Sequence, residues 1–152
     1  IVNVGLMLGV DGTKMSKSAG NSVLPDELIE KYGSDAFRLW ISFIAPFEQT
    51  KLWKEDGLKG CVKFLKRLEN LTDKITDEEI PYQKVLFEKL DKAVKQDIEK
   101  FSFNTAVPRF MTIVNELTKQ EKVNRKVLND IIYCLQPFCP KTYVVLSEKI
   151  SK

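Results

Sequence analysis

Histidine is entirely missing from this sequence of 152 residues. Its absence excludes Ser-His-Asp and Cys-His nucleophilic pairs, imidazole-ligated metals and histidine acid–base chemistry. Cysteine is scarce too, and Cys61, Cys134 and Cys139 have neither C-x-x-C spacing nor an obvious fourth ligand for zinc. We therefore expect no metal site, and expect the cysteines to be small apolar residues on helix faces in a reducing compartment.

Long apolar runs are also lacking. No stretch approaches the roughly 18 residues of a membrane-spanning helix, and the first residues lack the basic and apolar regions of a secretory signal. We expect a cytoplasmic protein without a membrane partner. The chain also starts at Ile1 rather than at an initiator Met, which suggests a piece of a longer protein.

The composition is that of an ordinary globular chain, with 43% hydrophobic and 30% charged residues. The net charge is −1 over residues 1–60 and +4 over residues 61–152, which together give +3. A surplus this small permits contact with nucleic acid but does not require it.

Five of the seven glycines lie in the first 33 residues, so this segment is rich in turns while the rest has helical periodicity. Alternating apolar residues predict a strand over 4–10. Asp11-Gly12 predicts a tight hairpin turn, with residues 13–15 returning and a small, polar loop over 16–24 after them.

Helices are predicted from there to the end of the chain. Pro25 and Gly33 bound a short helix, and Ser34 is expected to cap a second helix over 35–44. The later helices are one with an apolar stripe at Leu58, Val62, Leu65, Leu68 and Ile75, one over roughly 82–101, two capped by Asn104 and Asn124, and one opened by Pro140. Pro108 is tolerable only within about the first turn of its helix. The predicted fold class is mainly α, an antiparallel helix bundle preceded by a short β-hairpin and loop.

One short segment has a composition suited to phosphate chemistry. Lys14 and Lys17 are three residues apart, interleaved with Ser16 and Ser18 and followed by a glycine. Two ammonium groups, two hydroxyls and the backbone N–H groups of such a loop can surround a polyphosphate. The segment is not a Walker P-loop, and composition alone also fits a solvated basic turn.

The order of these residues carries more information than their composition. Residues 14–18 read Lys-Met-Ser-Lys-Ser, and this segment resembles the KMSKS signature of the class I aminoacyl-tRNA synthetases. Asp11-Gly12 before it and Gly20-Asn21 after it also resemble that family. Residues 31–38 resemble a segment found downstream of this signature in the large branched-chain synthetases. Further segments resemble the leucyl branch of the family, namely residues 43–49, 57–68, 103–107, 115–117 and 135–140, together with Trp53. The chain departs from the family pattern at Lys141, where a histidine is usual, and at Pro108, where a helix former is commoner.

The resemblance implies roles for the loop. Lys14 and Lys17 would be catalytic, with Lys17 the principal contact to ATP and to the departing pyrophosphate. Residues Lys14, Met15, Ser16, Lys17 and Ser18 would bind ATP, which enters with Mg²⁺, and Met15 would anchor the loop by packing. Enzymes of the leucyl branch join leucine to ATP through attack by the leucine carboxylate. The loop therefore needs to position the phosphates and neutralise their charge rather than supply a nucleophile.

The resemblance also implies an organisation and partners. Residues 1–50 would be the KMSKS loop and stem-contact region at the end of a catalytic domain, and residues 51–152 a helical domain of the anticodon-binding type. The partners would be tRNA(Leu), ATP and leucine, with no DNA. The family's His-Ile-Gly-His signature and leucine pocket would lie outside these residues, so we expect the 152-residue chain alone to be inactive in leucine-dependent ATP–pyrophosphate exchange.

Basic residues in the helical half are candidate tRNA contacts, although each also fits a solvated surface. The candidates are Lys63, Lys66 and Arg67 on one helix and Lys119, Lys122, Arg125 and Lys126 around one loop. Two other interpretations stay open. The chain could derive from a valyl, isoleucyl or methionyl enzyme, which the residues at 47–53 and 103–106 disfavour, or it could be a non-catalytic RNA-binding helical module with a vestigial loop.

Overall fold

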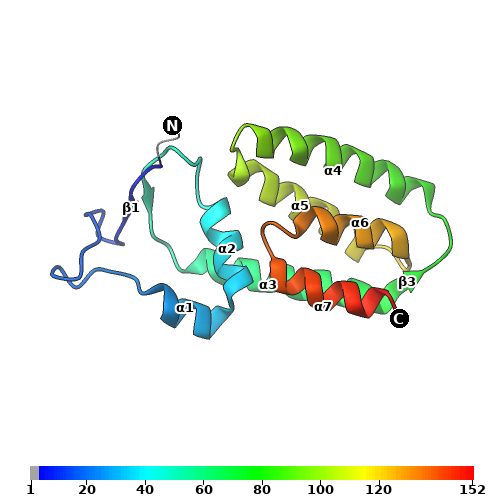
Figure 1. Cartoon of the computed structure of the whole chain (residues 1–152), viewed down its shortest axis with the longest axis horizontal. Helices are drawn as coiled ribbons and strands as arrows, with labels where there is room; N and C mark the ends of the chain where they lie inside the picture. The colour runs from blue at the N-terminus through cyan, green and yellow to red at the C-terminus, as the bar shows by residue number, and fades with distance from the viewer. Residues whose placement is uncertain (1–3) are drawn as a thin grey trace.

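The computed structural model describes residues 4–152, which form helices joined by short connections and two small parallel sheets (Figure 1). In chain order the elements are β1 (Met7–Leu8), α1 (Pro25–Tyr32), α2 (Ser34–Phe43), β2 (Lys51–Leu52), α3 (Asp56–Asn70), the 3₁₀ helix η1 (Leu71–Lys74), β3 (Ile75–Thr76), α4 (Pro81–Glu99), α5 (Phe103–Thr118), β4 (Val123–Asn124), α6 (Arg125–Leu135) and α7 (Pro140–Ile150). The mainly helical fold class predicted from the sequence is confirmed. In the part of the chain that the structure describes, no helix has both the length and the apolar character needed to cross a bilayer.

The predicted strand over 4–10 is wrong in extent, because only Met7–Leu8 form a strand. This strand pairs in parallel with β2, more than forty residues later, rather than within a long hairpin. The N–H of Lys51 donates to the carbonyl of Leu6, and that of Trp53 donates to the carbonyl of Leu8, both at 2.9 Å. Local alternation did not reveal this distant partner.

The predicted turn after β1 is confirmed on a small scale. The N–H of Gly9 donates to the carbonyl of Thr13 at 2.8 Å, and Leu8 forms a single antiparallel bridge with Lys14. Gly12 has φ +77°, a conformation that glycine adopts without a steric penalty. The chain therefore reverses at Asp11-Gly12 and returns directly into the lysine-containing loop.

Helices α1 and α2 follow the loop and meet at Gly33, whose φ is +86°. Pro25 is the first residue of α1, as predicted, because proline lacks only an N–H that has no partner inside the helix at this position. The predicted cap by Ser34 is wrong. Gly33 occupies the N-cap position of α2 and Ser34 is already helical, so its hydroxyl does not accept a capping bond.

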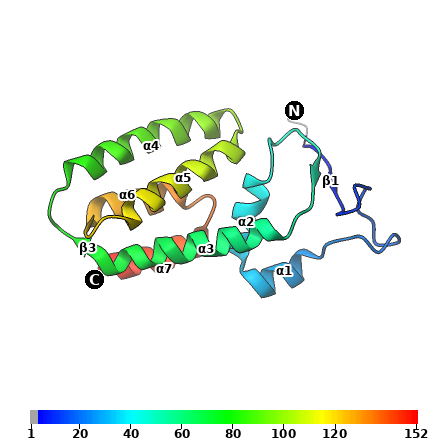
Figure 2. The ribbon, with the colours of Figure 1, turned by 180° about the vertical axis from the view of Figure 1, so that it is seen from behind.

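Helices α3 to α7 form the predicted bundle, with successive helices running in opposite directions (Figure 1). Figure 2 shows α3 along the base of the bundle with α7 behind it, while α4 and α5 lie antiparallel above them. Helix α2 packs against α3 and α5 and so joins the first segment to the bundle. The largest fully buried side chains are Phe64, Phe110, Leu39, Leu58, Leu68, Leu71, Leu117, Leu128, Ile131, Ile132, Leu135 and Leu146.

The predicted apolar stripe of α3 is wrong in the middle of the helix, where the buried residues are one position away from those predicted. Cys61 and Phe64 are buried between Leu58 and Leu68, whereas Val62 is 37% exposed and Leu65 is half-buried. The burial positions 58, 61, 64 and 68 follow the three- and four-residue spacing of one helix face. Ile75 lies beyond the helix, in β3. In α4 the apolar spacing of Leu86, Leu90, Val94 and Ile98 predicts an inward face, but Ile98 is on the surface with 36% exposure.

The predicted helix caps have mixed outcomes. Asn124 caps α6 as expected, since its Oδ1 accepts a hydrogen bond of 3.0 Å from the N–H of Val127. The cap predicted at Asn104 is wrong, because α5 begins at Phe103 with Ser102 in the N-cap position. Pro108 consequently lies in the interior of α5, beyond the first turn within which a proline is readily tolerated.

Candidate functional site

The loop that follows the Asp11-Gly12 turn exposes the two predicted lysines. Lys14 lies at the antiparallel bridge to Leu8, and Lys17 begins a turn closed by the N–H of Gly20, which donates to the Lys17 carbonyl at 3.2 Å. Both side chains are exposed, and within residues 4–152 neither ammonium group has an ion-pair partner. Two cations thus stand at one end of the molecule, available to an anion.

The other three residues of the motif shape the loop. Ser16 Oγ accepts from the N–H of Ala19 at 3.2 Å and lies 3.3 Å from Ser18 Oγ, so the tip folds on its own hydroxyls. Met15 is half-buried and packs against the hydrophobic core, which is the anchoring that the sequence predicts for this side chain. Met15 therefore attaches the loop to the core, while the side chains of Lys14, Lys17 and Ser18 stay in solvent.

Asn21 is a residue of this site whose role the sequence did not reveal. Its side chain bonds across the loop to groups on the opposite arm, among them the backbone N–H of Ser16 at 2.9 Å and the hydroxyl of Thr13 at 2.8 Å. The sequence pattern marks Asn21 only as a flank of the motif. The signal in the sequence is its place beside Gly20 at the end of a polar loop, where an amide can bond to backbone.

The basic residues of α3 are divided by their contacts. Lys63 and Arg67 lie one helical turn apart and are exposed, and no carboxylate within residues 4–152 pairs with either. Lys66 instead contacts Glu69 at 2.9 Å, and Glu69 also contacts Lys149 of α7 at 2.6 Å. The two lysines together lower the pKa of Glu69 to about 2, with Lys149 the larger cause. Lys63 and Arg67 are the better candidates for an external anion.

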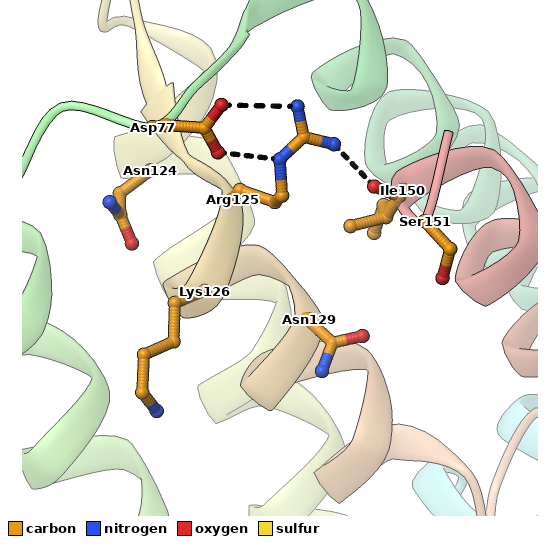
Figure 3. A pocket seen from close by; sticks show the side chains of 7 residues that line it. All are labelled: Asp77, Asn124, Arg125, Lys126, Asn129, Ile150 and Ser151. Atoms are coloured by element: carbon orange, nitrogen blue, oxygen red, sulfur yellow. Dashed lines mark hydrogen bonds and ion pairs between the residues drawn. The ribbon is translucent and has the colours of Figure 1, made fainter.

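The second basic cluster is neutralised within the bundle. Arg125 pairs with Asp77 at 2.6 Å and also donates to the carbonyl of Ile150 at the end of α7 (Figure 3). These contacts line a shallow pocket of about 330 Å³ and lower the pKa of Asp77 below its usual value. The remaining lysines are paired as well: Lys119 with Glu116, Lys122 with Glu78 and Lys126 with Asp130. Arg125 and Lys122 thus join distant segments of the bundle, whereas Lys119 and Lys126 pair with carboxylates one helical turn away.

The cysteines have the structural character that the sequence predicts. Cys61 and Cys139 are buried, Cys134 is half-buried, and all three are free thiols. Burial raises the pKa of Cys61 to about 12 and that of Cys134 to about 11, so both remain protonated and poorly nucleophilic at neutral pH. Among residues 4–152, no three His, Cys, Asp or Glu side chains are arranged to hold a metal ion.

Comparison with known proteins connects this fold and loop to an enzyme class. The sequence profile of the tRNA synthetases class I (I, L, M and V) matches residues 1–54, which include the whole lysine-containing loop. The leucine–tRNA ligase of Phocaeicola vulgatus is 44% identical over 134 residues, covering 84% of this chain and 14% of the ligase. The leucine–tRNA ligase of Leptospira biflexa is 40% identical over 149 residues, covering 92% of this chain and 17% of the ligase.

Solved structures agree with the sequence relatives. The LeuRS of Agrobacterium radiobacter K84, crystallised as a ternary LeuRS–tRNA–LeuAMS complex, matches 99% of this chain and 22% of its own, with a TM-score of 0.84 and 25% identity. A methionyl-tRNA synthetase of Mycobacterium tuberculosis bound by methionyl-adenylate matches 93% of this chain and 36% of its own, with a TM-score of 0.73 at 17% identity. The second likeness concerns the fold alone.

The helical bundle, the preceding loop segment and these matches define a class I aminoacyl-tRNA synthetase fold. Within that class, the relatives that are 40–44% identical over most of the chain are leucine–tRNA ligases. The chain belongs to the leucine–tRNA ligase family, and it spans 14–17% of the length of the two curated relatives described above.

Proposed function

We propose that this chain is part of an ATP-dependent leucine–tRNA ligase and supplies its phosphate-binding loop. The observation that carries this proposal is the pair of exposed ammonium groups, Lys14 and Lys17, on a loop whose base is fixed by hydrogen bonds. Within residues 4–152, Lys119, Lys122 and Arg125 of the second basic cluster are bound to carboxylates, whereas these two lysines have no such partner. Exposed ammonium groups that form no ion pair within the fold can bind an anionic ligand without first breaking such a contact.

The chemistry of adenylate formation matches what this loop offers. The carboxylate of leucine attacks the α-phosphorus of ATP, the bond to the β-phosphate oxygen breaks, and pyrophosphate leaves with the electron pair. This in-line displacement needs positioning and neutralisation of charge on the leaving phosphates. Lys17, at the turn, is the principal contact to the departing pyrophosphate, and Lys14 is the second. Each charge-assisted contact contributes about 1.5–3 kcal/mol, and one that tightens in the transition state increases the rate.

The hydroxyls of Ser16 and Ser18 supply weaker hydrogen bonds to the same phosphates, and Met15 holds the loop to the core. Mg²⁺ enters as the counter-ion of ATP, held by the phosphate oxygens. The residues that bind leucine and the adenine ring belong to other parts of the ligase, so the 152-residue chain alone is inactive. Leucine-dependent ATP–pyrophosphate exchange by the pure chain would contradict this division of roles.

Replacement of Lys17 by alanine in the full-length ligase tests the proposal. We expect leucine-dependent ATP–pyrophosphate exchange to fall by about 10²-fold or more, with the affinity for leucine unchanged, because the Lys17 ammonium acts on the phosphates. Lys84→Ala provides a matched control, since Lys84 is an exposed lysine of α4, far along the chain from the loop. A loss of less than about threefold in Lys17→Ala removes the catalytic role.

The helical domain, residues 51–152, contacts tRNA(Leu) through the exposed cations of α3. Lys63 and Arg67 support this part of the proposal, because they are exposed, adjacent on one helix face and without a carboxylate partner in residues 4–152. Lys66 is a weaker contact, since it is already paired with Glu69. Phosphate contacts of this kind add affinity without reading sequence.

Replacing both Lys63 and Arg67 by alanine in the ligase tests the tRNA contact. Binding of tRNA(Leu) should weaken, and the slope of log affinity against log salt should decrease by about one for each phosphate that the ligase no longer neutralises. Exchange of pyrophosphate, which does not need tRNA contact by α3, should stay unchanged. Lys92→Ala on α4 serves as the control, and an unchanged salt slope in the double variant refutes the contact.

A further inference from the structure

The base of the KMSKS loop is held together by the carboxamide of Asn21. Its Oδ1 accepts the backbone N–H of Ser16 at 2.9 Å, while its Nδ2 donates to Thr13 Oγ1 at 2.8 Å and lies 3.3 Å from the carbonyl oxygen of Lys14. These three groups belong to the arm of the loop that carries Lys14. Asn21 belongs to the other arm, beyond the turn that carries Lys17. One side chain therefore closes the loop across its base.

Asp11 completes this closure from the preceding turn. Its carboxylate accepts from the N–H of Thr13 at 3.0 Å and from the Thr13 hydroxyl at 2.8 Å, and its oxygens lie 3.4 and 3.5 Å from Nδ2 of Asn21. The bonds from Thr13 are the main reason that the pKa of Asp11 lies below its ordinary value, so the group is ionised at neutral pH. The turn, the lysine arm and the exit arm thus meet at the Asn21 carboxamide.

The space around the closure is restricted. A Cβ built on Gly9 would lie 2.7 Å from Asp11 Oδ1, closer than a Cβ comes to another atom, and a tight 3.1 Å from Asn21 Nδ2. Gly9 also donates its N–H to the Thr13 carbonyl at 2.8 Å. The absence of a side chain at position 9 lets the hydrogen-bonded groups approach the backbone of the turn.

Asparagine suits this position because the position needs both a donor and an acceptor. The backbone N–H of Ser16 requires an acceptor, while the Thr13 hydroxyl, the Lys14 carbonyl and the Asp11 carboxylate face a donor. An aspartate of the same shape would satisfy only the first and would place a second negative charge beside Asp11. Alanine would leave all of these groups to water.

We propose that Asn21 is a positioning residue, which fixes the base of the loop so that Lys17 and Lys14 meet the phosphates of ATP from a preformed turn. The inference rests on the proposed function, since it gives Asn21 a role only through those lysines. A turn that is already ordered loses less conformational entropy when it closes on a ligand, so the benefit is expected in the rate of adenylate formation. The tip, residues 17–20, is bonded mainly to itself and to Ser16.

The test combines two variants with a double-mutant cycle in the full-length ligase. In Asn21→Ala and Asn21→Asp, kcat for ATP–pyrophosphate exchange should fall by about tenfold, with KM for leucine unchanged. In a Lys17→Ala background the same substitutions should cost less than about twofold, because the lysine that they position is already absent. Ser22→Ala, one residue further on and without a side-chain bond within residues 4–152, is the control and should match the wild type in both backgrounds.

A second readout separates this inference from the proposed function. Hydrogen exchange of the backbone amides of residues 9–22, measured by mass spectrometry, should be faster in both Asn21 variants and unchanged in Ser22→Ala. The melting temperature of both variants should stay within a few degrees of the wild type. If Asn21→Ala lowers it further, the positioning role is judged from Asn21→Asp alone. Equal losses of kcat with and without Lys17, or a loss below about threefold in the single variants, would overturn the positioning role. If Lys17→Ala itself has no effect on ATP–pyrophosphate exchange, the proposed function fails. The hydrogen-exchange result still reports whether Asn21 orders the loop.

Discussion

At the scale of single residues, the molecule separates cations that hold its elements together from cations that face solvent. Arg125 joins the β3–α4 connection to the end of α7, and Lys149 joins α7 to Glu69 of α3. Lys14 and Lys17 have no comparable partner within residues 4–152. The sequence alone treats all of these residues as basic surface, because pairing depends on which segments the fold brings together.

The ion pairs of Glu69 give the bundle a measurable pH dependence. Its pKa falls from an ordinary value of 4.5 to about 2 in the folded chain, mainly through Lys149. A carboxylate with a lowered folded-state pKa stabilises the protein above its unfolded pKa, and this stabilisation is lost as the pH falls toward 2. We expect Glu69→Gln to lower the free energy of unfolding by up to about 1 kcal/mol at pH 7 and by almost nothing near pH 2.

Urea denaturation at several pH values measures this difference, with Glu88→Gln on the exposed face of α4 as the control. A Glu69→Gln difference that is constant from pH 7 to pH 2 would show that the ion pairs do not stabilise the fold.

The exposed loop and the turn before it were predictable from the sequence, because they follow from glycine and polar residues. The role of the motif lysines stays a prediction, which rests on the specific order Lys-Met-Ser-Lys-Ser. The role of Asn21 was not predictable, since a carboxamide that bonds across a loop depends on the distance between its arms. The same applies to the separation of Lys63 and Arg67 from the paired Lys66.

At the scale of elements, the type of a residue predicts the start of a helix only when the backbone at that residue has the conformation of a helix start. Pro25 and Asn124 begin their helices as expected. Ser34 and Asn104 do not cap their helices, because both already lie inside them. The N-cap positions are occupied by Gly33 before α2 and by Ser102 before α5. The phase of α3 was set by Cys61 and Phe64 against α2 and α5, contacts that periodicity alone did not reveal.

Two glycines in α3 offer a matched test of this packing. A Cβ on Gly57 would lie 2.1 Å from the ring of Trp40, whereas a Cβ on Gly60 would meet nothing within 4 Å. Gly57→Ala should therefore destabilise the protein by about 1–3 kcal/mol through displacement of the indole. Gly60→Ala should stabilise it by up to about 1 kcal/mol, because alanine favours the helix at an open site.

Thermal and urea unfolding of the two variants measure these opposite effects. Equal shifts for Gly57→Ala and Gly60→Ala would mean that α2 and α3 are not in close contact at Trp40.

At the scale of the whole molecule, contacts distant in sequence attach the loop-bearing segment to the bundle. Strand β1 pairs with β2, and Asp35 of α2 accepts hydrogen bonds from the N–H and hydroxyl of Thr142 in α7, at 2.6 and 2.7 Å. Asp35 therefore satisfies the first turn of a helix 107 residues away. The sequence predicted the bundle and the loop separately, but not this connection, because no local pattern identifies a cap supplied by another segment.

Loss of this connection should lower the stability of the whole chain. Asp35 is buried, with 6% exposure, and Asp35→Ala leaves the Thr142 groups without their partner, so we expect a loss of about 2–3 kcal/mol. Asp35→Asn keeps an acceptor of the same shape and should cost less. Asp26→Ala, at the exposed start of α1, should have almost no effect, and urea unfolding compares the three. Equal stability of Asp35→Ala and Asp26→Ala would contradict the role of this contact.

The central claim is that Lys17 and Lys14 hold the phosphates of ATP, and lysine labelling of the full-length ligase tests it most directly. The rate of acylation of each lysine by an N-hydroxysuccinimide ester is measured by mass spectrometry, with and without Mg-ATP and leucinol, which lacks the attacking carboxylate. We predict that labelling of Lys17, and to a smaller extent Lys14, slows severalfold at saturating ATP, while labelling of Lys84 and Lys92 is unchanged. Equal labelling of Lys17 in the free and ATP-saturated enzyme would contradict the claim.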